Sequence, residues 1–146
     1  MGSPDCYVRP PALFGQFPLN FTMRYNVQMP NNSLSGLTKI VLDFRTARDW
    51  KQFHTTKELA ISLVVESAEL LEIFQWKQGA ELDQAVANRN TEISDELADC
   101  LHSILLLAHD LKIDLGDALI EKMRKMEAKY PVAKAKGKPR KYNELE

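Results

Sequence analysis

Segment 57–77 (KELAISLVVESAELLEIFQWK) constrains the fold more than any other part of the chain. Its apolar residues cover most of the circumference of a helix, which is typical of a helix surrounded by other helices rather than one lying on a surface. Thr55 or Thr56 can cap the start of this helix, and Gly79 ends it. The segment therefore predicts a central buried helix and, with it, a helical domain.

Apolar residues recur at spacings of three and four in other segments too, and these predict helices over about 37–50, 91–111 and 114–129, with a short helix also allowed over 81–88. Ser35 can cap the first of them, and Pro131 ends the last. No alternating strand pattern or hairpin dipeptide is present. Short connections between four helices predict an all-α fold, an antiparallel four-helix bundle.

The two ends of the chain differ from this helical domain, which we place at residues 33–131. Residues 1–32 hold five of the seven prolines, and their aromatic residues follow no helical period. We expect an irregular extension there, vector-derived or translated from upstream sequence, or else a segment that docks its aromatic side chains on a neighbouring subunit. Residues 132–146 carry five basic residues between Lys134 and Lys141 and form a basic C-terminal tail.

Composition argues against several classes of function. Nineteen Lys and Arg balance twenty Asp and Glu, so no global field would attract a nucleic acid polymer or an acidic membrane. The chain has no apolar run of the roughly 18 residues that a transmembrane helix needs, and no signal-peptide pattern. Its two cysteines are too few for a disulfide framework. We expect a cytoplasmic protein that binds neither membranes nor nucleic acid polymers.

Two pairs of acidic residues interrupt the apolar helices. Glu66 and Glu69 are three residues apart and share one face of helix 57–77. Glu96 and Asp99 repeat this spacing on helix 91–111, and antiparallel packing would bring the two pairs face to face. Four carboxylates so close would repel one another unless they are solvated, partly protonated or bridged by cations.

Two interpretations of these acids stay open. A single E-x-x-E on a helix is usually a solvated face, so the chain could be a non-catalytic helical oligomerisation or binding module. Two such pairs within apolar helices favour a metal site instead. An all-oxygen ligand set without histidine indicates Mg²⁺, with Mn²⁺ as a possible substitute, rather than Zn²⁺.

Residues 104–108 (ILLLA) make helix 91–111 apolar on all sides. A single layer of four helices cannot bury such a surface, so we expect a homo-oligomer, a dimer or a tetramer. The alternative is that a short fifth helix or the N-terminal segment covers the surplus.

The acidic pairs ESAE (66–69) and ELAD (96–99) resemble the E-x-x-E…E-x-x-D signature of the MazG-like all-α nucleoside triphosphate pyrophosphohydrolases. Within this family, segments 48–77, 122–131 and 140–145 are most similar to the dCTP pyrophosphatase branch. The resemblance runs from about residue 37 to the C-terminus. It implies an all-α enzyme that assembles as a tetramer of tight dimers with composite active sites.

The resemblance also implies an activity, which is Mg²⁺-dependent hydrolysis of deoxynucleoside triphosphates to the monophosphate and pyrophosphate. It implies dCTP or a modified dCTP as the preferred substrate and a role in nucleotide-pool house-cleaning. The same fold allows a second activity, on dUTP or a phosphoribosyl nucleotide. The residues that match the catalytic and metal-binding acids are Glu66, Glu69, Glu96 and Asp99.

Divalent ions in such sites neutralise phosphate charge and lower the pKa of the attacking water. The acceptor of the water's proton stays open among Glu69, Glu92 and Asp95. The two tryptophans match aromatics that line the base pocket of the branch, although a tryptophan is more often a core residue. The substrate-binding residues implied by the resemblance are Trp50, Phe53, His54, Trp76, Lys122, Arg140, Lys141 and Tyr142.

Overall fold

The computed structural model describes residues 32–145, and these residues form helices and connections without a strand. The all-α class is therefore confirmed. The prediction of an irregular extension over 1–32 falls, apart from Asn32, outside the described residues. The elements are α1 (Leu34–Thr46), η1 (Trp50–Gln52), α2 (Thr56–Phe74), α3 (Gly79–Asn88), α4 (Asn90–Asp110), α5 (Leu115–Lys129), α6 (Val132–Ala135) and η2 (Tyr142–Glu144).

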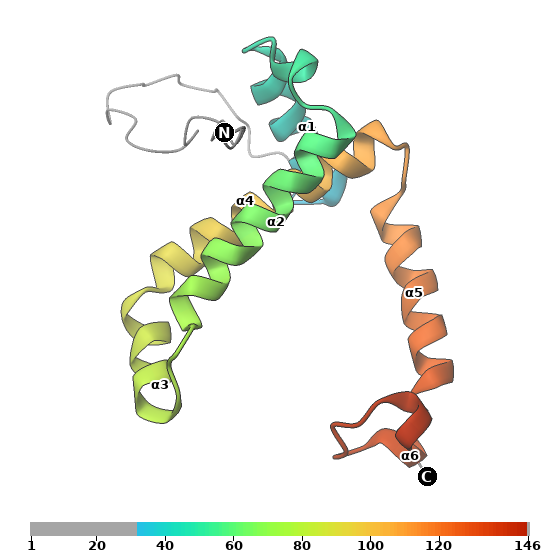
Figure 1. Ribbon diagram of the computed structural model, residues 1–146. Coiled ribbons are helices and arrows are strands. Elements are labelled where there is room, and N and C mark those ends of the chain that lie inside the picture. The colour runs from blue at the N-terminus through green and yellow to red at the C-terminus, as the bar shows by residue number, and fades with distance from the viewer. Residues whose placement is uncertain (1–31, 146) are drawn as a thin grey trace, which may run out of the picture.

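Helices α2 and α4 form the centre of the fold and run side by side in opposite directions (Figure 1). The core lies where they meet α1 and α3, and it includes Leu59 and Ile73 of α2 and Leu105 and Leu106 of α4. Leu106 is completely buried. This pair of helices fixes the relative position of the acidic residues that they carry.

Side-chain caps explain where the helices begin. Ser33, rather than the expected Ser35, accepts a hydrogen bond from the Gly36 amide at 3.2 Å and caps α1. Thr55 accepts one from the Glu58 amide at 3.2 Å and caps α2. Helix α1 ends at Thr46, before the predicted residue 50, and a left-handed Asp49 (φ 53°) starts the separate turn η1.

Helix α5 is separate from the rest of the fold. Figure 1 shows it leaving the α2–α4 pair as an arm that leads to α6, and none of its residues is buried. Lys112, with a φ of 57°, turns the chain away just after α4. The predicted four long helices therefore exist, but the fourth does not pack against the other three, so residues 32–145 by themselves do not close the bundle.

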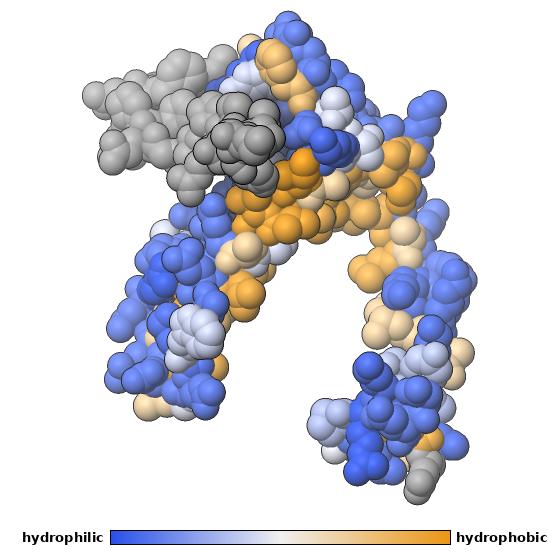
Figure 2. Space-filling model, in the orientation of Figure 1, coloured by the Kyte–Doolittle hydropathy of each residue, from blue (hydrophilic) through white to orange (hydrophobic). Residues whose placement is uncertain are grey.

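Exposed apolar side chains mark the surfaces that this arrangement leaves uncovered. Figure 2 shows hydrophobic residues gathered along the inner side of the arch that the α2–α4 pair and α5 form. On α2, Val64 is 69% exposed and Leu71 is 60% exposed, so within the described residues this helix is not surrounded as its sequence predicts. On α5, Leu119 and Ile120 are exposed as well.

Residues 32–145 contain no helix that is both long enough and apolar enough to cross a membrane.

Candidate metal and nucleotide site

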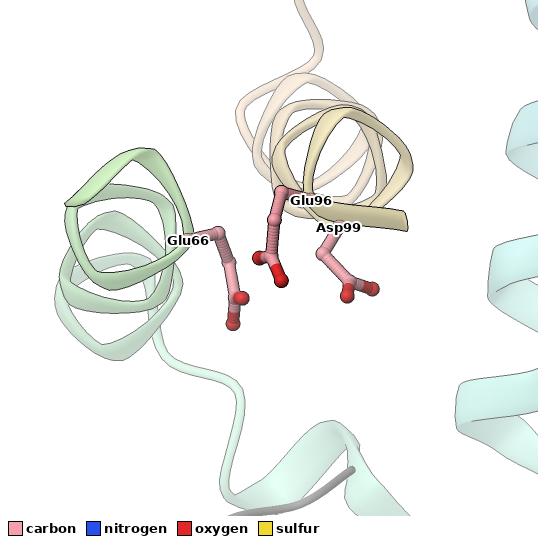
Figure 3. Close-up of side chains that lie close together, drawn as sticks. All are labelled: Glu66, Glu96 and Asp99. Carbon is pink, nitrogen blue, oxygen red and sulfur yellow. The ribbon is translucent and has the colours of Figure 1, made fainter. Parts of the chain in front are cut away.

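Three of the four predicted acids converge between the two central helices. Glu66 of α2 and Glu96 and Asp99 of α4 each place a carboxylate oxygen within 4.8 Å of the other two. Figure 3 shows their side chains pointing into one space on the same side of the helix pair. We call these three residues the acidic cluster. All three are partly buried, so water screens their charges only in part.

Glu69, the fourth predicted acid, does not join this group. It lies one turn beyond Glu66 on α2 and is exposed. Its charge still reaches the cluster, because it contributes to raising the pKa values of Glu66 and Glu96. The structure therefore brings three of the predicted acids into contact distance and leaves Glu69 beside them.

Burial and mutual repulsion disfavour the charged forms of the cluster. Burial, followed by the charges of Asp99, Glu69 and Glu96, raises the pKa of Glu66 to about 7. Burial and neighbouring carboxylates, Glu69 first among them, also raise the pKa of Glu96. Burial and then Asp95 raise the pKa of Asp99. At neutral pH the cluster thus favours binding of a proton or of another cation.

The donor set and its surroundings fit a hard divalent cation. The Oε2 atom of Glu96 is buried and has no hydrogen-bond partner in the described chain. No Lys or Arg among residues 32–145 forms an ion pair with Glu66, Glu96 or Asp99. Carboxylate oxygens alone are the ligands that Mg²⁺ and Mn²⁺ prefer in proteins. These three residues can therefore hold such an ion.

The other two acids near the cluster differ in their environments. Glu92 is exposed and accepts a hydrogen bond from Arg89 Nε at 2.9 Å, and this bond lowers its pKa. Asp95 is exposed and forms no ion pair among the described residues. Of the two, Asp95 is the better placed to accept a proton, since Glu92 is held by a cation.

The predicted aromatic residues before α2 cluster beside α1. The Trp50 ring meets Phe44 edge-on with a centroid distance of 5.8 Å and lies 5.9 Å from the ring of His54. Arg48 packs its guanidinium over the Phe44 ring, 3.6 Å from the centroid. Phe53, in contrast, is 63% exposed. Trp50 and His54 thus form a structured unit, and Phe53 lies at its surface.

His54 carries an unsatisfied polar atom. Its Nδ1 is buried without a hydrogen-bond partner in the described chain. Burial, and then the charge of Arg45, lower the pKa of His54, and the same two causes lower the pKa of His102 on α4. Both imidazoles are therefore neutral at pH 7.

The remaining predicted substrate residues lie away from the acidic cluster in the same chain. Trp76 is 90% exposed after the end of α2, with a φ of 66°. Lys122 is exposed on α5, and Arg140 and Lys141 are exposed in the tail beyond α6 (Figure 1). Tyr142, in η2, packs edge-on against Tyr130 with a centroid distance of 6.2 Å. Because α5 forms a separate arm, the structure does not bring these basic residues to the cluster of their own chain.

The sequence reasoning missed an ion-pair network at the other end of α4. Asp110 accepts hydrogen bonds from Arg45 of α1 and from Lys51 of η1. A signal for it exists, because Asp110 lies on the same helical face as Glu96 and Asp99 at spacings of 14 and 11 residues. Sequence alone does not show which cations meet it there.

A hollow of about 520 Å³ lies apart from these acids, where the start of α1 meets the end of α4 and the start of α5. Residues such as Leu34, Thr38 and Ile113 line it, and no residue of the acidic cluster does. His109, Lys112 and Asp114 also line it, so this hollow and the acidic cluster are separate features of the fold.

The raised pKa of Glu66 predicts how stability depends on pH without metal. The Glu66 carboxyl group stays protonated up to about pH 7 in the folded protein, but only up to about pH 4.5 in the unfolded chain. The stability that this difference provides is complete below pH 4.5 and is lost as the pH rises through 7. We expect the urea midpoint of the metal-free protein to fall between pH 4.5 and 8, and to fall less in Glu66→Gln. Glu72→Gln, an exposed change on the same helix, is the matched control. Equal slopes in Glu66→Gln and the unmodified protein would contradict the prediction.

Comparison with known proteins agrees with this arrangement. The sequence model of the MazG-like family matches residues 61–145. The rat and human proteins named dCTP pyrophosphatase 1 are 35% and 36% identical over 118 residues, which cover 80% of this chain and 69% of each relative. The crystal structure of a pyrophosphatase from Archaeoglobus fulgidus superposes with a TM-score of 0.64 and 39% identity, covering 67% of this chain and 92% of that one. The family match spans more than half of the sequence and includes every acid of the cluster, and the chain therefore belongs to the MazG-like family.

Proposed function

We propose that this protein hydrolyses deoxynucleoside triphosphates to the monophosphate and pyrophosphate in a Mg²⁺-dependent reaction, with dCTP or a modified dCTP preferred. As a member of its family with pyrophosphatase relatives, the chain is a nucleoside triphosphate pyrophosphohydrolase. The observation that supports the finer proposal is the convergence of Glu66, Glu96 and Asp99, none of which pairs with a Lys or Arg of residues 32–145. The role that follows is nucleotide-pool house-cleaning.

Charge is the physical reason why the reaction needs a metal. A polyphosphate chain is strongly anionic, and the acidic cluster would repel it at short range. Glu66, Glu96 and Asp99 would hold a divalent ion, which would neutralise phosphate charge and lower the pKa of the attacking water. Without a cation the acidic cluster would therefore oppose binding of the triphosphate, and with a bound cation it would favour that binding.

Glu69 and Asp95 are the acids that we propose as acceptors of the water's proton. Both are exposed and lie close to the acidic cluster in the sequence. Their charges also act on it, since Glu69 contributes to raising the pKa of Glu96 and Asp95 contributes to raising that of Asp99. Glu92 is less suited, because its ion pair with Arg89 lowers its basicity.

Aromatic residues would bind the base. The neutral His54 offers a buried ring nitrogen for a hydrogen bond, and Trp50 lies against it. Trp76 is open to solvent and can stack on a base, an interaction worth about 1–3 kcal/mol. These contacts would supply the base preference, and the acidic cluster would serve every triphosphate alike.

We also propose that the protein is a homo-oligomer, a dimer or a tetramer. The apolar inner side of the arch and the unpartnered α5 need a second surface to cover them. An arm from another copy would also carry Lys122, Arg140 and Lys141 toward the site of its neighbour. These basic side chains of the neighbouring copy would then be available to bind the phosphates.

The activity is tested by measuring pyrophosphate release from each of the four deoxynucleoside triphosphates. We expect release to require Mg²⁺, to be restored by Mn²⁺ after treatment with EDTA, and to be fastest with dCTP. Asp99→Asn and Glu96→Gln should each lower kcat at least about a hundredfold, because each removes a charged ligand.

Glu72→Gln is the control for these variants, since Glu72 is an exposed acid of α2 outside the cluster. Undiminished turnover in Asp99→Asn, or turnover that EDTA does not affect, would refute the metal-dependent reaction. Faster hydrolysis of dUTP or of a phosphoribosyl nucleotide would instead favour the second activity open to this fold.

The assembly is tested by light scattering coupled to gel filtration. We expect a mass that is two or four times the 16.7 kDa of the chain. Ile120→Asp and Met123→Asp should shift the mass toward one chain, because both residues are exposed apolar side chains of α5. Lys125→Gln changes the opposite side of the same helix and should leave the assembly intact. A single-chain mass for the unmodified protein would contradict the proposal.

A further inference from the structure

The face of α4 that carries the metal-binding acids continues to the end of the helix. Asp99 and Asp110 are 11 residues apart, so they point in directions that differ by only about 20°, about 16 Å apart along the axis. His102 and Leu106 lie between them on the same face. One end of this face therefore belongs to the acidic cluster, and the other end to Asp110.

Asp110 joins three separate elements of the fold. Arg45 of α1 donates from Nη1 to Oδ2 at 2.9 Å and from Nη2 to Oδ1 at 3.0 Å. Lys51 of η1 donates to Oδ2 at 2.6 Å. Arg45 is only 4% exposed, and the Asp110 side chain is only 10% exposed. Charge-assisted, bidentate bonds in such a protected position are both directional and strong.

The turn η1 is short, and two contacts connect it to the helices beside it. It has three residues, follows a left-handed Asp49 and has no side-chain cap at its start. A turn of this length is not stable by itself, since one turn of helix fixes more backbone freedom than its hydrogen bonds repay. Lys51 connects it to α4 through Asp110, and the contact of Trp50 with Phe44 connects it to α1.

The same turn carries the residues proposed to bind the base. Trp50 is the first residue of η1, and the His54 amide bonds back to the Trp50 carbonyl at 3.1 Å. His54 also lies close enough to Arg45, Lys51, Asp110 and His102 for their charges to affect its titration. The charges of the Asp110 network therefore reach His54.

We propose that Asp110, with Arg45 and Lys51, is a positioning unit that fixes Trp50 and His54 at the base-binding end of the site. This inference rests on the proposed function, because it assumes that Trp50 and His54 meet the base of a nucleotide. Asp110 does not touch the substrate, and the acidic cluster is about three helical turns away. Loss of the unit should therefore weaken nucleotide binding and base choice and leave the phosphate chemistry unchanged.

Kinetics of Asp110→Asn test this separation. For the preferred deoxynucleoside triphosphate we expect KM to rise about tenfold, because losing roughly one aromatic contact weakens binding by about that factor. We expect kcat to stay within about twofold of its original value. The ratio of kcat/KM between the preferred and the poorest base should fall by a similar factor. Lys51→Met removes one bond from an exposed lysine, so it should keep the fold and raise KM about threefold.

Asp43→Asn is the matched control, because the exposed Asp43 side chain pairs with Lys39 on the same helix as Arg45 and is not part of the Asp110 network. It should leave KM, kcat and base preference unchanged. Suppose that the unmodified enzyme is active and that both Asp110→Asn and Lys51→Met lower kcat but leave KM and base preference unchanged. This result would overturn the inference. If the unmodified enzyme hydrolyses no nucleotide, the proposed function fails first, and the role of the unit in base binding fails with it.

A substrate-free readout follows Trp50 directly. The chain has two tryptophans, so Trp76→Phe leaves Trp50 as the single reporter. In that background Asp110→Asn and Lys51→Met should shift the emission to longer wavelength and increase quenching by acrylamide, whereas Asp43→Asn should not. Emission and quenching that stay the same in both variants would show that the ion pairs do not fix Trp50, and would overturn the inference.

Discussion

Repulsion among carboxylates that packing holds together is the interaction on which the rest of this structure depends. Glu66, Glu96 and Asp99 place oxygens within 4.8 Å of one another, and in the part of the chain that the structure describes no Lys or Arg forms an ion pair with them. Removal from water, followed by the charges of nearby carboxylates, raises their pKa values, and for Glu66 the value reaches about 7. An arrangement that costs stability in the empty protein becomes favourable when a divalent ion binds to it.

The α2–α4 pair maintains this arrangement because its core lies elsewhere along the same helices. Leu106 and Leu105 are buried near the end of α4, and Ile73 is buried near the end of α2. Packing at these points fixes the register of the two helices, and the acids follow from that register. The face of α4 that carries the acids also reaches Asp110, so a single helix connects the acidic cluster with the turn that bears Trp50.

Sequence was sufficient for those features that depend on local pattern. Helical periodicity predicted the central helices, and the paired E-x-x-E and E-x-x-D spacings predicted which acids share a face. The contact of Asp110 with Arg45 and Lys51 was not predictable from local pattern. Asp110 follows Arg45 by 65 residues and Lys51 by 59 residues, and only the folding of the chain brings them together. Likewise, the periodicity of α5 predicts a helix but does not show which surface the helix packs against. The spacing of Glu69 from Glu66 is that expected of a second metal ligand, but its side chain is exposed.

The most direct test of the central claim is titration of the protein with Mn²⁺, followed by the loss of the free-ion electron paramagnetic resonance signal. We expect saturable binding of Mn²⁺, and we expect Mg²⁺ to displace it. Glu96→Gln and Asp99→Asn should each weaken Mn²⁺ binding at least about tenfold, whereas Glu72→Gln should leave it unchanged. Equal Mn²⁺ binding in all four proteins would show that the ion binds elsewhere, and would contradict the claim that these carboxylates form a metal site.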